Sequence, residues 1–313
     1  MKVLITGANG FVGQKLRLVL EESGFEIVPV FRAHQPGLEK DICNAIIGKN
    51  IDATTDWTNA LIDVEAVIHL AARVHVMDDG EAGDLARFRE INVEGTRNLA
   101  KQAAQSGVKR FIYLSSIKVN GERTNDEPFS IDQPPKPEDS YAISKMEAEV
   151  ALRKIEEATD MDVVIIRPPL VYGPGVKGNF LTLVNMVRRG MPLPFGLVGN
   201  RRDLVSIYNL CDLIEKCILH PAALGGTFLV SDNESISTTE LIRYIAKGLK
   251  RNARLFSVPI WALKFAAGLV GKNEKLETLT GNLQIDISPT QQVLEWSPPL
   301  TVAQSFRKMF TEG

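Results

Sequence analysis

Three residues in the middle of the chain have types and a spacing that suit hydride-transfer chemistry. Ser116 follows a short apolar run, and Tyr141 and Lys145 lie 25 and 29 residues after it. The four-residue spacing puts the phenol and the ammonium on one helix face, about one turn apart. A free tyrosine, with a pKa of about 10, is a poor acid or base at neutral pH, but a neighbouring cation favours the phenolate and lowers that pKa. Ser116 can hold a substrate oxygen whose charge changes, so the trio predicts hydride transfer at a carbinol or ketone carbon.

Each member of this trio also has an ordinary structural interpretation. A tyrosine on a helix usually packs against its neighbours, and a lysine one turn further on is usually solvated. The order of the three residues, after a glycine-rich turn and at the end of a predicted strand, favours catalysis by Ser116, Tyr141 and Lys145.

Gly7, Gly10 and Gly13 stand between the first apolar run and the first helical pattern. In that context one glycine allows the tight turn, one lets a pyrophosphate approach the backbone, and one lets helix and strand pack closely. The helix N-terminus then offers unpaired N–H groups to phosphates. The alternative is a plain tight turn, but the position after a strand favours a dinucleotide site.

The end of the second apolar run bears on the choice between NAD and NADP. An acidic residue there would bind the ribose 2′-hydroxyl, whereas an arginine accommodates a 2′-phosphate. The run ends in Arg32, and no carboxylate follows until Glu39. The sequence therefore favours NADP, with NAD and a solvated Arg32 as the alternative.

Short apolar runs alternate with helical patterns through the first half of the chain. Strands are predicted at 3–5, 27–31, 64–70, 111–114 and 163–166, with a weak one within 41–51; helices are predicted at 11–23, 88–106 and 140–157. Pro29 is a mild objection to the second strand. This alternation predicts an α/β fold with a Rossmann doubly wound parallel sheet covered by helices on both faces.

The pattern changes after about residue 168, where glycines and prolines become frequent up to residue 200. Such a composition is typical of substrate loops between short elements. Helical patterns follow at 209–220, 238–250 and 258–270. We expect an NAD(P)-binding Rossmann domain over 1–167 and a smaller C-terminal α/β substrate-binding lobe for a nucleotide sugar over 168–313, interwoven with the first.

The composition excludes several classes of protein. The 313 residues are 44% hydrophobic and carry a net charge of −2, which argues against a disordered chain and against a nucleic-acid partner. Three scattered cysteines suit neither a disulfide framework nor a zinc site, so no metal is expected. Residues 260–270, interrupted by Lys264, are too few to span a bilayer. With no signal-peptide pattern, the expectation is a cytoplasmic protein without membrane insertion.

Further motifs make the sequence resemble the extended short-chain dehydrogenase/reductase family, which includes the nucleoside-diphosphate-sugar epimerases, dehydratases and reductases. In family order the matching pieces are Thr6-Gly7-x-x-Gly10-x-x-Gly13, His69-Leu70-Ala71-Ala72, Asn92-Val93-x-Gly95-Thr96, Leu114-Ser115-Ser116, Tyr141-x-x-x-Lys145, Arg167-Pro168-x-x-Val171-Tyr172-Gly173-Pro174 and Arg202-Asp203. The late Leu294-Glu295-Trp296-Ser297-Pro298 resembles the family's closing signature. The resemblance covers nearly the whole chain.

The resemblance implies roles for residues at the matching positions. Tyr141 would be the general acid/base, assisted by Ser116, while Lys145 would hold the nicotinamide ribose and lower the tyrosine pKa. The implied cofactor-binding set is Gly7, Gly10, Phe11, Val12, Gly13, Arg32, Leu70, Ala71, Ala72, Asn92, Leu114, Tyr141, Lys145 and Pro168. The implied substrate-binding set is Ser116, Lys118, Asn179 and Arg202, and a surface arginine is the alternative for Arg202.

Two departures from the family pattern bear on the net reaction. Ile117-Lys118 stands where the dehydratases carry an Asp-Glu pair, so dehydration is not expected. Arg32 stands where NAD-retaining epimerases usually carry an acidic residue. The string from Leu114 to Gly121 resembles the corresponding segment of sugar 4-ketoreductases of bacterial surface-polysaccharide synthesis. In the present chain, Lys118 of this string either reaches the substrate or is a solvated loop residue.

The leading hypothesis is therefore reduction of a UDP-4-keto-6-deoxy-N-acetylhexosamine with NADPH. A UDP-hexose 4-epimerase with tightly bound NAD is the second hypothesis, and a non-catalytic NADP-binding sensor is the third. The resemblance also implies a homodimer in which helices 88–106 and 140–157 form a four-helix bundle.

Overall fold

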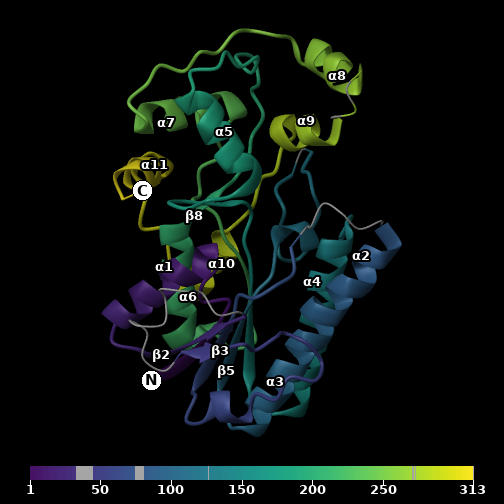
Figure 1. Cartoon of the computed structure of the whole chain (residues 1–313), viewed down its shortest axis with the longest axis vertical. Helices are drawn as coiled ribbons and strands as arrows, with labels where there is room; N and C mark the ends of the chain where they lie inside the picture. Colours follow the sequence, from purple (N-terminus) through teal and green to yellow (C-terminus); the bar gives the residue numbers. More distant parts are fainter. Residues whose placement is uncertain (33–44, 75–80, 126, 270, 272, 313) are drawn as a thin grey trace.

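Seven parallel strands form the main sheet of the computed structural model, which describes residues 1–32, 45–74, 81–125, 127–269, 271 and 273–312 (Figure 1). The strands are β1 (Lys2–Thr6), β2 (Glu26–Phe31), β3 (Ile46–Ile47), β4 (Ala66–His69), β5 (Arg110–Leu114), β6 (Asp162–Arg167) and β9 (Thr227–Leu229). Their order across the sheet is β3-β2-β1-β4-β5-β6-β9. The strand order reverses at β1 and β4, and such a switch point opens a crevice at the carboxyl ends of the strands.

Helices cover both faces of this sheet, because alternate strand residues point to opposite sides. Val3 and Ile5 belong to the core beneath α1 (Phe11–Glu22) and α6 (Ile207–Leu219), whereas Leu4 belongs to the core beneath α3 (Thr96–Gln105) and α4 (Ser140–Ala158). Figure 1 shows the two helical layers on either side of the sheet. The predicted Rossmann doubly wound fold is confirmed.

Three local details differ from the sequence expectation. The helix predicted at 88–106 is α2 (Glu81–Phe88), then a π-helical segment η2 (Arg89–Gly95), then α3. The weak strand expected within 41–51 is only β3, and residues 41–44 lie outside the described residues. Pro29 is accommodated within β2, which pairs with β3 only at Val30 and Phe31.

The chain after residue 168 builds a second core around stacked aromatic rings. Helices α5 (Gly178–Arg188), α7 (Thr238–Gly248) and α11 (Val302–Thr311) surround Tyr172 and Phe306, whose ring centroids are 4.5 Å apart. A short parallel pair, β7 (Val171–Tyr172) and β8 (Val205–Ser206), enters this core. Helices α8 (Ile260–Leu269) and α9 (Asn273–Thr280) form a separate small apolar cluster with Val198, whereas α10 (Ser288–Leu294) packs into the core of the main sheet.

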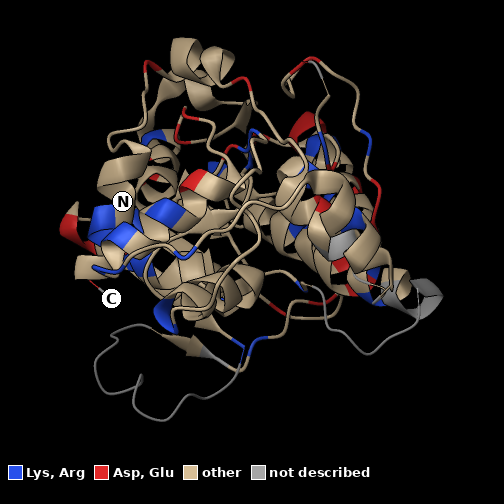
Figure 2. Ribbon diagram, turned by 90° about the horizontal axis from the view of Figure 1, so that it is seen from above, with Lys and Arg blue, Asp and Glu red and all other residues tan. Residues whose placement is uncertain are grey.

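Helix α6 and strand β9 return to the main sheet although they follow residue 167. The division of tasks between 1–167 and 168–313 stays a prediction. Among the described residues, no helix is both long and apolar enough to cross a bilayer. Figure 2 shows Lys and Arg interspersed with Asp and Glu over the helices, so anionic ligands would be met by local groups.

Candidate active site

The glycine-rich turn lies at the carboxyl end of β1, beside the end of β4. Gly7 has a φ of +69°, and a Cβ there would lie 2.9 Å from the backbone nitrogen of Ala71. A Cβ on Gly13 would lie 2.2 Å from the Gly7 carbonyl oxygen, so only glycine lets α1 pack this closely on the turn. The N–H of Gln14 makes the first bond back to Gly10, at 3.0 Å. The amides of residues 11–13 therefore have no helical partner and can meet a diphosphate.

A buried histidine fixes the floor beside this turn. His69 Nδ1 lies 2.6 Å from Thr6 Oγ1, and its Nε2 lies 2.9 Å from Thr96 Oγ1. Burial, with the Lys145 charge, lowers the pKa of His69 to about 3, so the ring is neutral. The Thr6 hydroxyl also accepts from the N–H of Ala71, at 3.3 Å. This network joins β1, β4 and α3 and positions half-buried Leu70, Ala71 and Ala72 at the strand end.

Tyr141 and Lys145 lie one turn apart on α4, as their spacing predicts. Lys145 is fully buried, its ammonium donates to the Leu114 carbonyl at 2.7 Å, and its Nζ lies 6.0 Å from the centre of the Tyr141 ring. Burial lowers the pKa of Lys145 to about 7, although the Glu149 carboxylate opposes this shift. Burial and the Asp139 charge raise the pKa of the Tyr141 phenol, so the lowering by Lys145 expected from the sequence is not the net effect in this structure. Such perturbed groups at one place mark a candidate catalytic site.

Glu149, one turn beyond Lys145, was not singled out in the sequence. Its carboxylate accepts from Arg167 Nε at 3.0 Å and Nη2 at 2.5 Å, and from the Ser115 hydroxyl at 2.5 Å. Both members of the ion pair are buried. Arg167 also donates to Asn120 Oδ1, at 3.0 Å. Only its spacing could have pointed to Glu149 in the sequence, because Tyr141, Lys145 and Glu149 follow one another at intervals of four residues on one helix face.

The loop after β5 is tied to the start of α4 by a second ion pair. Asp139 caps α4 by accepting from the Ala142 N–H at 2.6 Å, and its other oxygen lies 2.6 Å from Lys118 Nζ. Burial disfavours the Lys118 ammonium, but hydrogen bonds to Asp139 and Glu122 outweigh this and raise its pKa. Ser116, two residues earlier, begins a short turn and accepts from the Lys118 N–H at 3.3 Å. Lys118 is thus held by carboxylates, and its role toward a substrate stays a prediction.

The π-helical segment η2 carries Asn92 into the space beside α4. Its amide nitrogen donates to Ser144 Oγ at 3.0 Å and to the Arg73 carbonyl at 3.1 Å, and its oxygen accepts from the Arg73 N–H at 2.8 Å. Single π turns often occur at functional sites, where they re-aim one side chain. Asn92 therefore joins the segment after β4 to the helix that holds Tyr141.

The remaining predicted cofactor residues lie at neighbouring strand ends. Arg32 is exposed immediately after β2, next to the glycine-rich turn. Pro168 is buried after β6, and its carbonyl accepts from the Ile117 N–H at 2.9 Å. Parallel pairing of β2, β1, β4, β5 and β6 brings these strand ends to one edge of the sheet.

The two distant substrate residues come from the second core. Asn179 is exposed in the first turn of α5. Arg202 is half-buried, its backbone pairs with Ile236, and its Nη1 donates to the Gly281 carbonyl at 3.1 Å. Burial lowers the pKa of the Arg202 guanidinium. Diphosphate binding by Asn179 and Arg202 stays a prediction.

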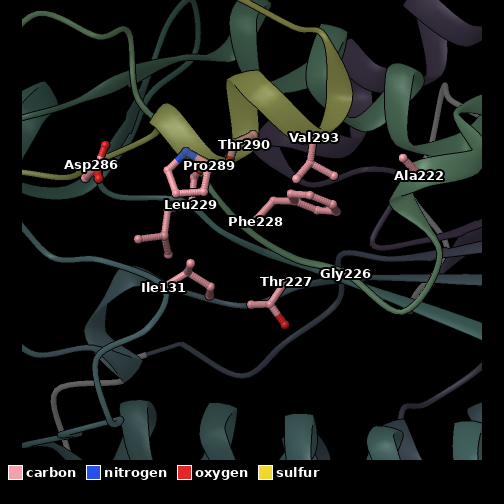
Figure 3. A pocket seen from close by; sticks show the side chains of 10 residues that line it. All are labelled: Ile131, Ala222, Gly226, Thr227, Phe228, Leu229, Asp286, Pro289, Thr290 and Val293. Atoms are coloured by element: carbon pink, nitrogen blue, oxygen red, sulfur yellow. Dashed lines mark hydrogen bonds between the residues drawn. The ribbon is translucent and has the colours of Figure 1, made fainter.

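A separate hollow of about 180 Å³ lies between β9 and α10 (Figure 3). Phe228, Leu229 and Val293 make it largely apolar, and its one carboxylate, Asp286, accepts from the Ser288 N–H at 2.9 Å. None of the predicted site residues lines this hollow.

Comparison with known proteins identifies the group to which this arrangement belongs. Residues 3–230 match the model of the NAD dependent epimerase/dehydratase family. The chain belongs to this family. A UDP-glucose 4-epimerase of Vibrio cholerae is 47% identical over 308 residues, which are 98% of this chain and 93% of that protein.

One more distant relative and one solved structure are also similar to this chain, and the solved structure shows the likeness of the fold. An N-acetyl-alpha-D-glucosaminyl-diphospho-ditrans,octacis-undecaprenol 4-epimerase of Escherichia coli O157:H7 is 27% identical, covering 86% of this chain and 77% of that protein. The crystal structure of UDP-glucuronic acid 4-epimerase from Bacillus cereus with NAD superposes with a TM-score of 0.78 at 21% identity, covering 99% and 98% of the two chains. The protein is thus an extended short-chain dehydrogenase/reductase of the nucleotide-sugar epimerase/reductase type.

Proposed function

We propose that the protein reduces the C4 ketone of a UDP-4-keto-6-deoxy-N-acetylhexosamine with NADPH, as a step in surface-polysaccharide synthesis. The observation that carries this proposal is the exposed Arg32 directly after β2. Its guanidinium can bind a 2′-phosphate, whereas none of the residues that the structure describes at this strand end, up to Arg32, offers the carboxylate that would hold a 2′-hydroxyl. A cofactor that is exchanged at each turnover suits a reductase better than an epimerase.

The described residues fit such a dinucleotide. The unpartnered amides at the start of α1 would hold its diphosphate, Leu70 and Ala71 would flank it, and Lys145 would reach its ribose. When bound, the nicotinamide supplies the hydride. Every other task in the reaction falls to the side chains of this chain.

Tyr141 starts the reduction as a proton donor. Because burial and Asp139 raise its pKa, the phenol is protonated at neutral pH, which is the state that a general acid needs. As hydride reaches C4, the phenol proton moves to the former ketone oxygen, and a Ser116 hydrogen bond holds that oxygen. The Lys145 ammonium then stabilises the phenolate until solvent returns the proton.

The absence of carboxylates after Ser116 agrees with reduction. Ile117 is buried and Lys118 is bound to two carboxylates, so neither position offers a base for removing water from a sugar. The same site could also oxidise and re-reduce C4, which is the chemistry of an epimerase.

The test combines cofactor analysis with a substrate assay. Purified protein should oxidise NADPH with UDP-4-keto-6-deoxy-N-acetylglucosamine, and Arg32→Ala should raise the KM for NADPH at least about tenfold while changing that for NADH little. An Arg243→Ala variant, altered at an exposed position of α7, is the matched control. NAD that is released only on denaturation, together with turnover of UDP-galactose, would refute the proposal.

A second candidate is a UDP-hexose 4-epimerase with tightly bound NAD. The observation that favours it is the 47% identity to the Vibrio cholerae UDP-glucose 4-epimerase. Turnover of UDP-glucose or UDP-N-acetylglucosamine without added cofactor would establish this function.

We also propose a homodimer through α3 and α4. A shallow groove between these helices is lined by Lys101, Val150 and Ile155, and Val150 is 49% exposed on its rim. A second copy of the same two helices would complete a four-helix bundle. Light scattering should give twice the chain mass, and Val150→Asp should give a monomer.

A further inference from the structure

Helix α8 presents large apolar side chains to solvent instead of to the core. Trp261, Phe265 and Leu269 are 73%, 68% and 74% exposed, whereas Leu263 is buried. Because the three exposed residues are four apart, they form one stripe along the helix. Scattered exposed leucines are ordinary, but a contiguous aromatic and aliphatic stripe marks an interaction surface.

The stripe continues onto the segments that precede α8. The backbone of Phe256 pairs with that of Leu193 at 3.1 Å, which brings the segment before α8 beside residues 191–197. The resulting α8 surface consists of Met191, Leu197, Phe256, Ile260, Trp261, Phe265 and Leu269, all exposed. Figure 1 shows α8 and the segment leading to it at the outer end of the molecule, far from the N-terminus.

The charge around the α8 surface is positive. Residues 250–272 contain five Lys and Arg and no Asp or Glu, whereas the whole chain has 36 Lys and Arg against 38 Asp and Glu. Lys250, Arg251, Arg254 and Lys264 are exposed. Lys264 lies within α8 and Arg254 lies two residues before Phe256, so the apolar surface carries cations in a chain that is slightly negative overall.

We propose that the α8 surface binds the anionic face of a lipid bilayer, with α8 lying in the plane of the interface. Exposed aromatic and aliphatic groups enter the boundary between headgroups and acyl chains while bordering cations meet anionic headgroups. Tryptophan favours this depth. With ten residues, α8 is about 15 Å long, which is too short to cross a hydrocarbon core of about 30 Å. The proposal is attachment to the membrane surface and does not require a segment that crosses the bilayer.

A second copy of the chain fits the α8 surface less well. In a symmetric dimer the same patch faces itself, so the bordering cations of both copies would be brought together. An anionic membrane removes this repulsion.

The α8 surface is also connected to the proposed substrate site, a link that rests on the proposed function. Helix α9 packs against α8, and α9 is followed by Gly281, whose carbonyl accepts from Arg202. A protein attached through α8 would hold this arginine close to the membrane.

Intrinsic fluorescence offers a direct test. Of the three tryptophans, Trp57 and Trp296 are buried and Trp261 is exposed. Vesicles of phosphatidylcholine with about 30 mol% phosphatidylglycerol should shift the emission to shorter wavelength and co-sediment with the full-length protein. Binding should be at least about tenfold weaker to phosphatidylcholine alone, because several cations lose their anionic partners.

Variants distinguish binding through the α8 surface from non-specific binding through other exposed apolar residues. Trp261→Ser with Phe265→Ser should weaken co-sedimentation about 100-fold or more. A matched pair, Leu219→Ser with Leu224→Ser, removes two exposed leucines elsewhere and should bind like the wild type. NADPH oxidation in lipid-free buffer should be equal in all three proteins, so failure of the proposed function would be recognised separately.

Three results would overturn the proposal. The first is that the wild type does not bind anionic vesicles, and the second is that the Leu219 and Leu224 control loses binding as much as the Trp261 and Phe265 variant does. The third is that the wild type forms an oligomer without lipid and that the Trp261 and Phe265 variant does not. The last result would assign the α8 surface to self-association.

Discussion

Replacing Lys145 by methionine should change how the stability of the fold depends on pH. The Lys145 ammonium is buried beside the Tyr113 ring, 4.4 Å from its centre, and has one hydrogen-bond acceptor, the Leu114 carbonyl. Burial lowers its pKa from 10.5 to about 7. The folded protein therefore releases a proton near neutral pH that the unfolded chain retains up to about pH 10.5.

The sign and size of the effect follow from proton linkage. Between pH 7 and 10.5 the unfolded chain binds more protons at this site, so the free energy of unfolding rises with pH by up to about 1.4 kcal/mol per unit. Below pH 7 the burial penalty is fully present. From pH 6 to pH 9 the wild type should gain roughly 2.5 kcal/mol relative to Lys145→Met. Loss of the hydrogen bond to Leu114 changes the difference in unfolding free energy between the two proteins at every pH, and it changes the dependence of that difference on pH less.

The assay is urea unfolding of nucleotide-free protein at pH 6, 7, 8 and 9, followed by circular dichroism. Lys247→Met, at an exposed position on α7, should follow the wild-type pH profile. Lys145→Met should also lose NADPH oxidation, because no ammonium remains beside Tyr141. Parallel stability profiles for the wild type and Lys145→Met would refute the reasoning, since the buried group would then not titrate in this range.

Three further predictions address the site. Tyr141→Phe should lower turnover at least about 100-fold while retaining NADPH binding, as measured by steady-state kinetics and calorimetry; near-normal turnover would exclude the phenol as the acid. Gly13→Ala should abolish cofactor binding in the same calorimetric assay, because its Cβ would meet the Gly7 carbonyl at 2.2 Å. Glu149→Gln should cost about 3–5 kcal/mol of unfolding free energy by leaving buried Arg167 without its ion pair. Adding Arg167→Met should recover part of that loss, and a double variant no more stable than the single one would contradict the pairing.

Local sequence was sufficient for the parts of the site that lie within one element or at its end. The spacing of Tyr141 and Lys145 fixed their shared helix face, and the glycines after β1 could serve only a tight strand-to-helix turn. The apolar runs predicted the buried parallel strands because a strand covered on both faces has no polar side. Asn92 was expected from the family motif, but the π-helical turn that aims it had no signal in the apolar pattern.

Interactions between distant segments could not be predicted in this way. No pattern in the sequence pairs Glu149 with Arg167, although Arg167 belongs to a family motif, and only the packing of α4 on β6 buries the two together. Lys118 was expected to face substrate or solvent, but the approach of the α4 start to the loop after β5 places Asp139 beside it. The 258–270 segment was predicted as a helix whose apolar part is too short to span a bilayer, and only the fold shows that Trp261, Phe265 and Leu269 are exposed.

The sequence by itself determined the Rossmann fold, the glycine turn and the Ser116, Tyr141 and Lys145 trio, because each depends on residues close together in the chain or on a repeating pattern. The tertiary structure alone decided which charges are buried, since burial depends on what lies across the sheet. It thereby decided the low pKa of Lys145, the ion pairs of Glu149 with Arg167 and of Lys118 with Asp139, and the exposed α8 surface. Desolvation and long-range pairing have no local pattern from which they could be predicted.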